Sequence, residues 1–350
     1  MQKNLLMAIC VFPTFTSVNA QDSARASSFK LSGSADVYYR YDFNNPKVAP
    51  YNNFTSFTHS QNSFEPGMIS VKAEHAIGKV GLVADIGFGK RAQEFSYNDS
   101  GSSVAIKQLY VTYVPVSGVK ITLGSWVTHI GYEAVDACLN RNYSMSYLFS
   151  YGPFFHTGLK SELALGERSS LMIGIVSPFD LKYASGLPKM MIAQLATTSK
   201  DEKLKASFNY QGGKYNDSAR LYQEDIVINY SIFDKFGLGY NGTLQTRQEH
   251  NSIKWNTAGS WWGSALYVTA DPKSWLGFTL RQEYFSDKKN VLGIDAYVFE
   301  TTFSTNFKID DLMLIPEFRY ENASKNIYKK SNGAFLKNTG SFLLAAVYKF

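Results

Sequence analysis

The sequence predicts an all-β protein, a closed transmembrane antiparallel up-and-down β-barrel of about 16 strands. Three observations predict it. Stretches of alternating apolar and polar residues recur along the chain, short and long connections alternate between these stretches, and 15% of the residues are aromatic. The sequence has no run of about 18 apolar residues, the length that a membrane-spanning helix needs. The strands themselves are therefore expected to cross a membrane.

The chain begins with a predicted signal peptide, residues 1–20, which is cleaved after Ala20. Lys3 supplies a positive charge, 5–15 is apolar, and small residues precede the cleavage point, which is the arrangement of a secretory signal. Pro13 and the short length of the apolar stretch argue against a buried or membrane-spanning helix here. The protein is therefore expected to be exported.

The remaining residues, 21–350, are predicted to form one barrel domain. Of the 35 basic and 29 acidic residues, only Lys3 leaves with the signal, so this domain has a net charge of +5. Its basic residues are scattered among acids, a pattern that does not predict nucleic-acid binding. Cys138 is the single cysteine that remains, and a chain of this size needs no disulfide. We expect Cys138 to be a buried or free thiol.

The first predicted strand, 29–43, shows the alternation most clearly. Leu31 and Val37 fall on one face, while Lys30 and Asp36 fall on the other, because successive side chains of a strand point to opposite faces. The whole chain, interpreted in this way, gives sixteen strands: 29–43, 66–77, 80–91, 104–114, 119–131, 156–165, 170–179, 189–198, 203–212, 222–232, 236–246, 260–270, 274–285, 293–306, 311–321 and 340–350.

The connections between these strands alternate in length. Those after even-numbered strands are tight, such as "GK", "SKDE" and "DPK", while those after odd-numbered strands are usually long and polar, such as 44–63 and 246–259. Short turns at one end and long loops at the other are typical of outer-membrane barrels, in which the turns are periplasmic and the loops extracellular. An even strand number places both chain ends on the short-turn side.

A soluble β-sandwich would also show alternation, but its apolar face would be a core of mainly Val, Ile and Leu. Here the apolar faces carry aromatic residues near their ends, including Phe29, Tyr39, Tyr284 and Tyr320. Aromatic residues in these positions are typical of the two girdles that a membrane barrel places at its interfaces. The pattern therefore favours the membrane barrel over the sandwich.

Several stretches resemble a known family. They are "GSADVYYRYDF", "SVKAEHAIGKVGLVADIGFGKRAQEFSYND" and above all "NRNYSMSYLFSYGPFFHTGLK", and the similarity returns at the C-terminal "FLLAAVYKF". These stretches are similar to the outer-membrane β-barrel porins of Bacteroidetes, of the OmpL-like β-barrel porin-2 type. The resemblance implies a porin-like fold in the bacterial outer membrane and implies no particular substrate.

The last strand ends the chain on an aromatic residue. Tyr348 and Phe350 share its apolar face and resemble the C-terminal signal by which outer-membrane barrels are recognised for insertion. This strand is expected to pair with the first strand and so close the sheet, because lipid offers no water to an open edge. Its other face is also apolar, with Leu343, Ala345 and Val347, which would suit contact with a loop folded into the barrel.

The faces opposite the apolar ones are expected to line the lumen. A barrel of 16 strands leaves an aqueous channel, so the charges on these faces are expected to stay hydrated. Their nearly balanced signs predict weak ion selectivity, since rings of one sign exclude the other. The pore-lining candidates are Arg40, Lys72, Glu74, Asp85, Lys160, Glu162, Arg281, Glu283, Glu317 and Arg319.

The connection between the fifth and sixth strands, 132–155, is the longest and the least like a solvated loop, because it is rich in aromatic residues and poor in charge. We expect it to fold inward and narrow the lumen, with Arg141 facing acidic groups across the pore. A plug-like packing element or a trimer contact is the alternative. The candidates for the constriction are Glu133, Asp136, Arg141, Tyr143, Tyr147, Phe149 and Tyr151.

No catalytic site and no metal site are predicted. A hydrolase would need a histidine beside a serine or a carboxylate, and only His129 and His156, which flank the long connection, approach one another. Strand parity places His129 on the apolar face and His156 on the lumen face, so they would not act together. Asp99 and Asp217 each follow an asparagine and precede a serine, a sequence more typical of turns than of calcium sites.

We therefore expect an outer-membrane porin without a cofactor, through whose water-filled lumen small hydrophilic solutes diffuse passively. Its expected partners are outer-membrane lipid, the barrel-assembly machinery during insertion, the solutes themselves and further copies of the chain in a homotrimer. Two alternatives remain open. One is a substrate-specific channel for sugars or oligopeptides, with the aromatic loop stacking on the solute, and the other is a barrel-anchored adhesin or interaction protein with a blocked lumen.

Overall fold

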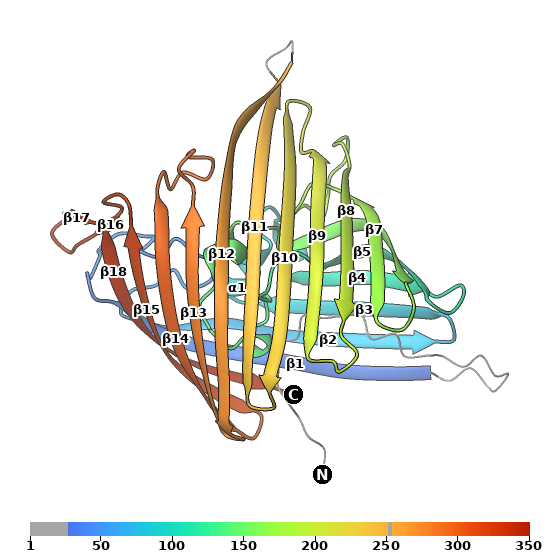
Figure 1. The fold of residues 1–350 in the computed structure, drawn as a ribbon, viewed down its shortest axis with the longest axis horizontal. Helices are drawn as coiled ribbons and strands as arrows, with labels where there is room; N and C mark the ends of the chain where they lie inside the picture. The colour runs from blue at the N-terminus through green and yellow to red at the C-terminus, as the bar shows by residue number, and fades with distance from the viewer. Residues whose placement is uncertain (1–26, 251–253) are drawn as a thin grey trace.

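The computed structural model describes residues 27–250 and 254–350, so the predicted signal peptide, 1–20, lies outside the described residues. Within them the chain forms a closed antiparallel barrel of sixteen strands (Figure 1). Each barrel strand pairs with the next barrel strand along the chain, β16 and β17 form a separate hairpin, and the ring closes where β1 pairs with β18. In this part of the chain no helix is long and apolar enough to cross a membrane.

The elements follow one another in simple order, with two α-helices, two short 3-10 helices (η) and a small hairpin lying in the connections. They are β1 (Ser27–Asp42), β2 (Ser63–Ile77), β3 (Val80–Phe88), α1 (Lys90–Phe95), η1 (Gly101–Ala105), β4 (Ile106–Tyr113), β5 (Val119–Val127), η2 (Ala137–Leu139), α2 (Tyr147–Ser150), β6 (Phe155–Ala164), β7 (Ser169–Val176), β8 (Met190–Thr198), β9 (Leu204–Lys214), β10 (Ala219–Phe233), β11 (Phe236–His250), β12 (Trp255–Lys273), β13 (Leu276–Ser286), β14 (Tyr297–Ile309), β15 (Leu312–Ala323), β16 (Tyr328–Lys329), β17 (Phe335–Leu336) and β18 (Asn338–Lys349).

All sixteen predicted strands are present, and several of their ends differ from the prediction. The third strand stops at Phe88, because Gly89 adopts a φ of 121° and α1 follows. The fifth stops at Val127, where the chain turns into the barrel. The predicted loop 246–259 is instead largely strand, since β11 continues to His250 and β12 begins at Trp255. Its polar composition suggested a loop, but the pairing of the two strands continues through it to His250 opposite Trp255.

The alternation of the sequence appears directly in the exposure of the side chains. In β14, Phe299 and Phe303 are on the outer face and are about half exposed, while Glu300, Thr302 and Ser304 point inward and are fully buried. An apolar outer surface is a large cost in water and a gain in lipid. The barrel is therefore built with its apolar side outward, the reverse of a soluble sandwich.

Both described chain ends lie on the short-turn side, as predicted. Phe350, the last residue, exchanges two backbone hydrogen bonds with Gly33 of β1, at 2.9 and 3.0 Å. From there the register continues as Ser34 opposite Lys349 and ends with Asp42 opposite Ser341. The predicted pairing of the last strand with the first is thus confirmed, and it is the pairing that closes the sheet.

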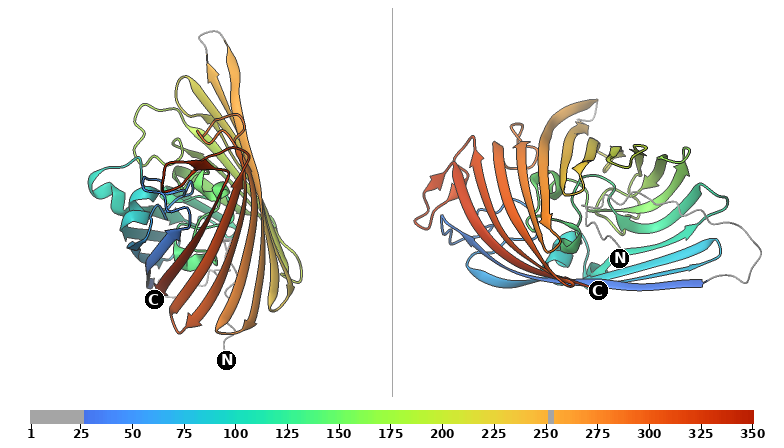
Figure 2. Two further views of the ribbon diagram at one scale, coloured as in Figure 1. Left: turned by 90° about the vertical axis from the view of Figure 1, so that its left-hand side faces the viewer. Right: turned by 60° about the horizontal axis from the view of Figure 1, so that its bottom comes forward.

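Three connections at the long-loop end pack together inside the barrel rather than extending into solvent: 43–62, 89–105 and 128–154. Figure 2 (right) shows the segments between β5 and β6, in teal and green, inside the ring of strands. The sequence predicted this for the third connection and missed it for the other two. The three connections bury a common apolar cluster, which we call the septum: Phe57, Phe95, Val135, Met145, Phe149, Phe154 and Phe155.

Candidate functional site

Residues 128–154, which we call the inward loop, leave β5 and cross the interior to the lumen faces of β12 to β15. The tip of the loop is the short helix α2, whose first turn is capped by Ser146. Glu283 of β13 accepts the backbone N–H groups of Tyr147 at 2.9 Å and Leu148 at 2.8 Å. The carboxylate thus satisfies two donors that a helix start leaves without intrahelical partners.

A second carboxylate of the wall makes the same kind of contact a few residues earlier in the inward loop. Glu317 of β15 accepts the backbone N–H of Tyr143 at 2.8 Å and that of Ser144 at 3.2 Å. Two lumen carboxylates therefore bind backbone of the inward loop rather than solvent.

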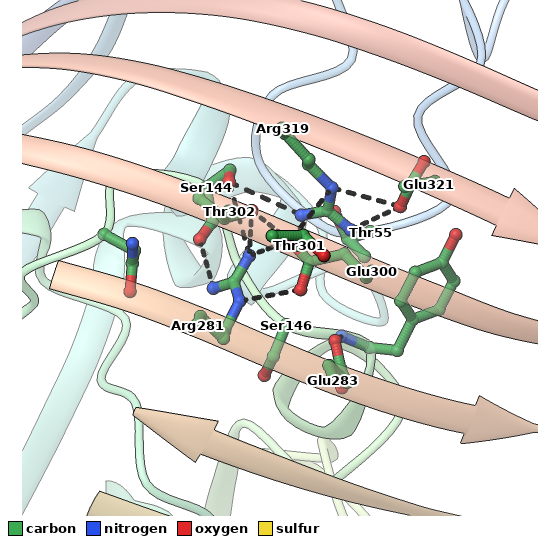
Figure 3. Close-up of polar contacts among 12 residues, drawn as sticks. Thr55, Ser144, Ser146, Arg281, Glu283, Glu300, Thr301, Thr302, Arg319 and Glu321 are labelled. Carbon is green, nitrogen blue, oxygen red and sulfur yellow. Dashed lines mark hydrogen bonds and ion pairs between the residues drawn. The ribbon is translucent and has the colours of Figure 1, made fainter. Parts of the chain in front are cut away.

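A buried ion network fixes the same segment to the wall (Figure 3). Arg281 of β13 bonds Glu133 of the inward loop at 2.6 Å and Glu300 of β14 at 3.1 Å. It also donates to the carbonyl of Ser144 at 2.8 Å, and Arg319 of β15 donates to the following carbonyl at 2.7 Å. The side chains of Arg281 and Glu300 are 0% exposed. Buried charges of this kind persist only with paired partners and full hydrogen bonding.

The expectation that the lumen charges stay hydrated is therefore wrong for most of the pore-lining candidates, Asp85 and Glu162 among them, which are buried in the wall. Arg281, Glu283, Glu317 and Arg319 face the lumen but are buried under the inward loop. Arg40 is buried under connection 43–62, where it donates to two backbone carbonyls. Strand parity fixes the face on which a side chain lies, but it does not reveal what covers that face.

Removing the positive charge of Arg281 should loosen the inward loop strongly. In Arg281→Met, Glu133 and Glu300 lose their shared counter-charge, and breaking a buried pair in this way costs about 3–5 kcal/mol. We expect earlier thermal unfolding and rapid tryptic cleavage at Arg141, which lies in the loop. Arg168→Met, at an exposed turn, is the matched control. Equal stability and equal protease resistance of the two variants would contradict an anchoring role.

Arg141 reaches the opposite wall, and the group it meets is acidic. Its guanidinium pairs with Asp271 of β12 through two hydrogen bonds, at 2.9 and 3.0 Å, and its Nε donates to Thr279. Lys308 bonds the same carboxylate at 3.0 Å. Arg141 is thus held against the wall in an ion pair.

Other constriction candidates also form hydrogen bonds or ion pairs with the wall or with another connection. Tyr143 donates its hydroxyl to Asp36 of β1 at 2.6 Å, and Asp136 pairs with Lys107 at 2.5 Å. Tyr151 donates to the carbonyl of Phe54 at 2.9 Å. Tyr147 is fully buried, and Phe149 belongs to the septum. The role of these residues in conduction stays a prediction.

The apolar lumen face of the last strand has the loop contact that the sequence suggested. Leu343, Ala345 and Val347 of β18 are buried with Ala137 and Tyr143 of the inward loop. Cys138 packs against the same cluster, half-buried and as a free thiol.

On the short-turn side of the inward loop lies a cavity of about 600 Å³, which we call the inner cavity. Its charged groups form pairs, such as Lys72 with Glu74 at 2.9 Å, and Glu162 with both Lys120 and Lys160. The charged residues that line it are Lys30, Lys72, Glu74, Asp85, Lys120, Glu133, Asp136, Lys160, Glu162 and Lys349. Five of the pore-lining candidates are among these.

On the long-loop side lies a second cavity of about 390 Å³, the outer cavity. The septum residue Phe154 lines both cavities, and its ring lies among those of Phe57, Phe95 and Phe149, at centroid distances of 5.4 to 6.1 Å. Among the described residues, Phe154 is thus the side chain that the two cavities share. The residues that line the outer cavity are Ser56, His59, Glu94, Tyr97, Ser150, Tyr151, Gly152, Phe154, Phe179, Asp180, Arg247 and Leu292.

Sequence reasoning missed some residues that hold this arrangement. Glu300 lies on the lumen parity of its strand and could have been found by that signal. Arg91 is the last residue of the predicted strand 80–91 and shares the parity of Asp85, and it is buried between the rings of Phe57 and Tyr143, at 4.9 and 4.8 Å. The apolar residues of connection 43–62, Phe57 among them, resemble those of the inward loop and were an available signal.

The placement of His129 corrects a prediction. Because β5 ends at Val127, strand parity no longer applies at His129, which lines the inner cavity. Its ring lies 5.1 Å from that of His156, so the two histidines do meet. His156 lies 3.2 Å from the hydroxyl of Thr128. Among residues 27–250 and 254–350, no group of three His, Cys, Asp or Glu side chains is arranged to hold a metal ion.

Solved structures of outer-membrane channels share this fold. The outer-membrane channel DcaP of Acinetobacter baumannii is 11% identical, with a TM-score of 0.62 over 93% of this chain and 97% of that one. The anion-selective porin of Comamonas acidovorans is 11% identical, with a TM-score of 0.59 over 93% of this chain and 100% of that one. OmpF of Salmonella typhi, in complex with daunomycin, is 10% identical, with a TM-score of 0.58 over 92% and 97%.

No curated protein matches the sequence. The model of one protein family, Putative beta-barrel porin-2, OmpL-like, matches residues 28–350, which is nearly the whole chain. The closed sixteen-stranded barrel, its apolar outer face and this match agree, and the chain belongs to the OmpL-like β-barrel porin-2 family of outer-membrane porins.

Proposed function

We propose that small hydrophilic solutes diffuse passively through the part of the lumen that the inward loop leaves free. The observation that carries this proposal is the inner cavity, whose wall combines five lysines with five acidic residues. Such a wall carries charges of both signs and has no excess of either. It supports a pore with weak ion selectivity, since selectivity needs a ring of one sign.

In this pore the inward loop would be the constriction, and the septum would be its narrowest point. A solute that passes from the outer to the inner cavity would pass Phe154, which lines both. Apolar rings at a narrow point exclude water and small ions unless they move aside. The flux would therefore depend on the size and mobility of this side chain.

Replacing Phe154 by alanine should raise the conductance. In planar bilayers containing potassium chloride, we expect discrete conductance steps for the wild-type protein and larger steps for Phe154→Ala, because the truncated side chain joins the two cavities. Phe303→Ala, which removes a ring from the outer face of β14, should leave the steps unchanged. Equal steps for wild type and Phe154→Ala would exclude the septum as the constriction, and the absence of any steps would exclude a porin.

A blocked barrel with a role in adhesion or interaction is the second candidate, and the close packing of the septum favours it. It predicts no conductance in the wild-type protein, together with binding to cells or matrix that depends on the outer loops. The bilayer recordings above therefore separate the two functions directly.

We infer that the chain acts as a channel and not as an enzyme, and that it assembles as a homotrimer in outer-membrane lipid. Insertion would use the barrel-assembly machinery, with Tyr348 and Phe350 as its signal, after export directed by residues 1–20. A Bacteroidetes origin is part of the same proposal and rests on the resemblance of the sequence stretches quoted above.

A further inference from the structure

The outer cavity has the composition of a small-molecule site. Its wall combines aromatic and apolar side chains with polar and charged ones; the former are Tyr97, Tyr151, Phe154, Phe179 and Leu292. Its volume of about 390 Å³ is within the range of about 300–1,000 Å³ common for ligand pockets. The lining residues come from all three inward connections and from three further segments. The cavity is therefore formed only when the loops pack together.

The acidic groups of this cavity are already satisfied by the protein. Asp180 accepts the backbone N–H groups of Phe154 and Phe155, and the hydroxyl of Tyr97 at 3.1 Å. Burial raises the pKa of the Asp180 carboxyl to about 7, which weakens its repulsion of an anion. Glu94 accepts the backbone N–H of Phe57 at 2.6 Å and lies 3.3 Å from His59.

Arg247 is the strong cation among the described residues that line the outer cavity, and hydrogen bonds hold its side chain in place. The Nε of Arg247 donates to Gln245 at 3.1 Å, and one terminal nitrogen, Nη1, donates to the carbonyl of Val291 at 3.2 Å. Within residues 27–250 and 254–350, no carboxylate lies in ion-pair distance of this guanidinium, and its other terminal nitrogen has no hydrogen-bond partner. This contrasts with Arg281 and Arg319, which are paired with glutamates.

We propose that the outer cavity binds a small aromatic carboxylate, with the carboxylate on Arg247 and the ring among Tyr151, Phe154 and Phe179. A guanidinium edge fixes a carboxylate in orientation as well as by charge, and aromatic walls bind a ring by offset stacking and burial. The site rests on the proposed function, since it would concentrate such solutes directly above the septum.

Titration calorimetry on the refolded full chain in detergent tests this site, with phenylacetate as the probe and phenylacetamide as its neutral match. We expect phenylacetate to bind more tightly than phenylacetamide, and Arg247→Gln to weaken phenylacetate binding by about tenfold, as the loss of a charge-assisted hydrogen bond predicts. Lys325→Gln, an exposed lysine of the 324–337 loop, should bind phenylacetate like the wild type.

Bilayer recordings in potassium chloride with the same probes distinguish this inference from the proposed function. Brief current blocks that require phenylacetate and disappear in Arg247→Gln support both. Conductance without phenylacetate binding, or binding that Arg247→Gln leaves unchanged, overturns the aromatic-carboxylate site and leaves the porin standing. Binding without any conductance supports the site and overturns passive diffusion.

Discussion

Deletion of residues 144–151 from the inward loop is expected to raise the single-channel conductance several-fold and to make the pore cation-selective. These residues form the tip that rests on β13 to β15. Their carbonyl groups accept from Arg281 and Arg319, and their N–H groups donate to Glu283 and Glu317. Without the tip this wall becomes the pore lining.

The sign of the selectivity follows from the charges that the deletion uncovers. The wall under the tip presents two arginines and an excess of glutamates, so its net charge is negative, and an acidic lining favours cations. The residues concerned are Arg281, Glu283, Glu300, Glu317, Arg319 and Glu321. The balanced inner cavity predicts no such preference in the wild-type protein.

Reversal potentials across a potassium chloride gradient measure this change, together with the size of the conductance steps. The matched control is deletion of 330–335, an exposed segment at the hairpin of β16 and β17, which should alter neither quantity. A tip deletion that leaves both conductance and reversal potential at their wild-type values would show that current does not pass beside the inward loop.

Deletion of Phe350 is expected to remove most of the protein from the outer membrane while export across the inner membrane continues. Phe350 makes two backbone hydrogen bonds with Gly33, and its ring lies over this glycine, which has no side chain to obstruct it. The deletion therefore removes the last pair of the seam that closes the barrel. It also removes the exposed aromatic residue that we expect the assembly machinery to recognise.

Fractionation of membranes, with heat-dependent mobility of the folded barrel on gels, measures this loss, and cleavage of the signal peptide reports export. Phe233→Ala is the control, because it truncates another exposed aromatic residue beside a short turn without touching the seam. If both variants insert to the same extent, the terminal residue has no special role in assembly.

Much of the barrel was predictable because a strand in a lipid-facing sheet obeys a local rule. Side chains alternate between two solvents, so Phe299 and Glu300 reveal their faces from sequence alone. The lengths of the connections are an equally local signal, since short hairpins join the strands at one end of the barrel only. The rule failed at His129, where the strand ends two residues earlier and the backbone turns inward.

The interior was much less predictable, because it depends on contacts between segments far apart in the chain. Arg281 has the same local signal as Lys72, a cation on a lumen face. Yet Lys72 lines a cavity, whereas Arg281 is sealed beneath residues more than a hundred positions earlier in the sequence. The aromatic composition of the inward loop indicated burial, but not the wall against which it is buried.

The sequence by itself determined that this chain is an outer-membrane barrel, the number of its strands, the face of each strand residue and the pairing of its two ends. Each of these follows from alternation, connection length or closure in lipid, and none of these rules requires knowledge of which distant segments contact one another. Only the tertiary structure decided which lumen charges meet solvent, because three connections fold into the same interior and cover part of its wall. Where the connections pack, Arg281 and Glu283 bind the backbone of the inward loop, and Arg281 also pairs with Glu300. Where the connections leave space, Lys72 and Arg247 line cavities that a solute could enter.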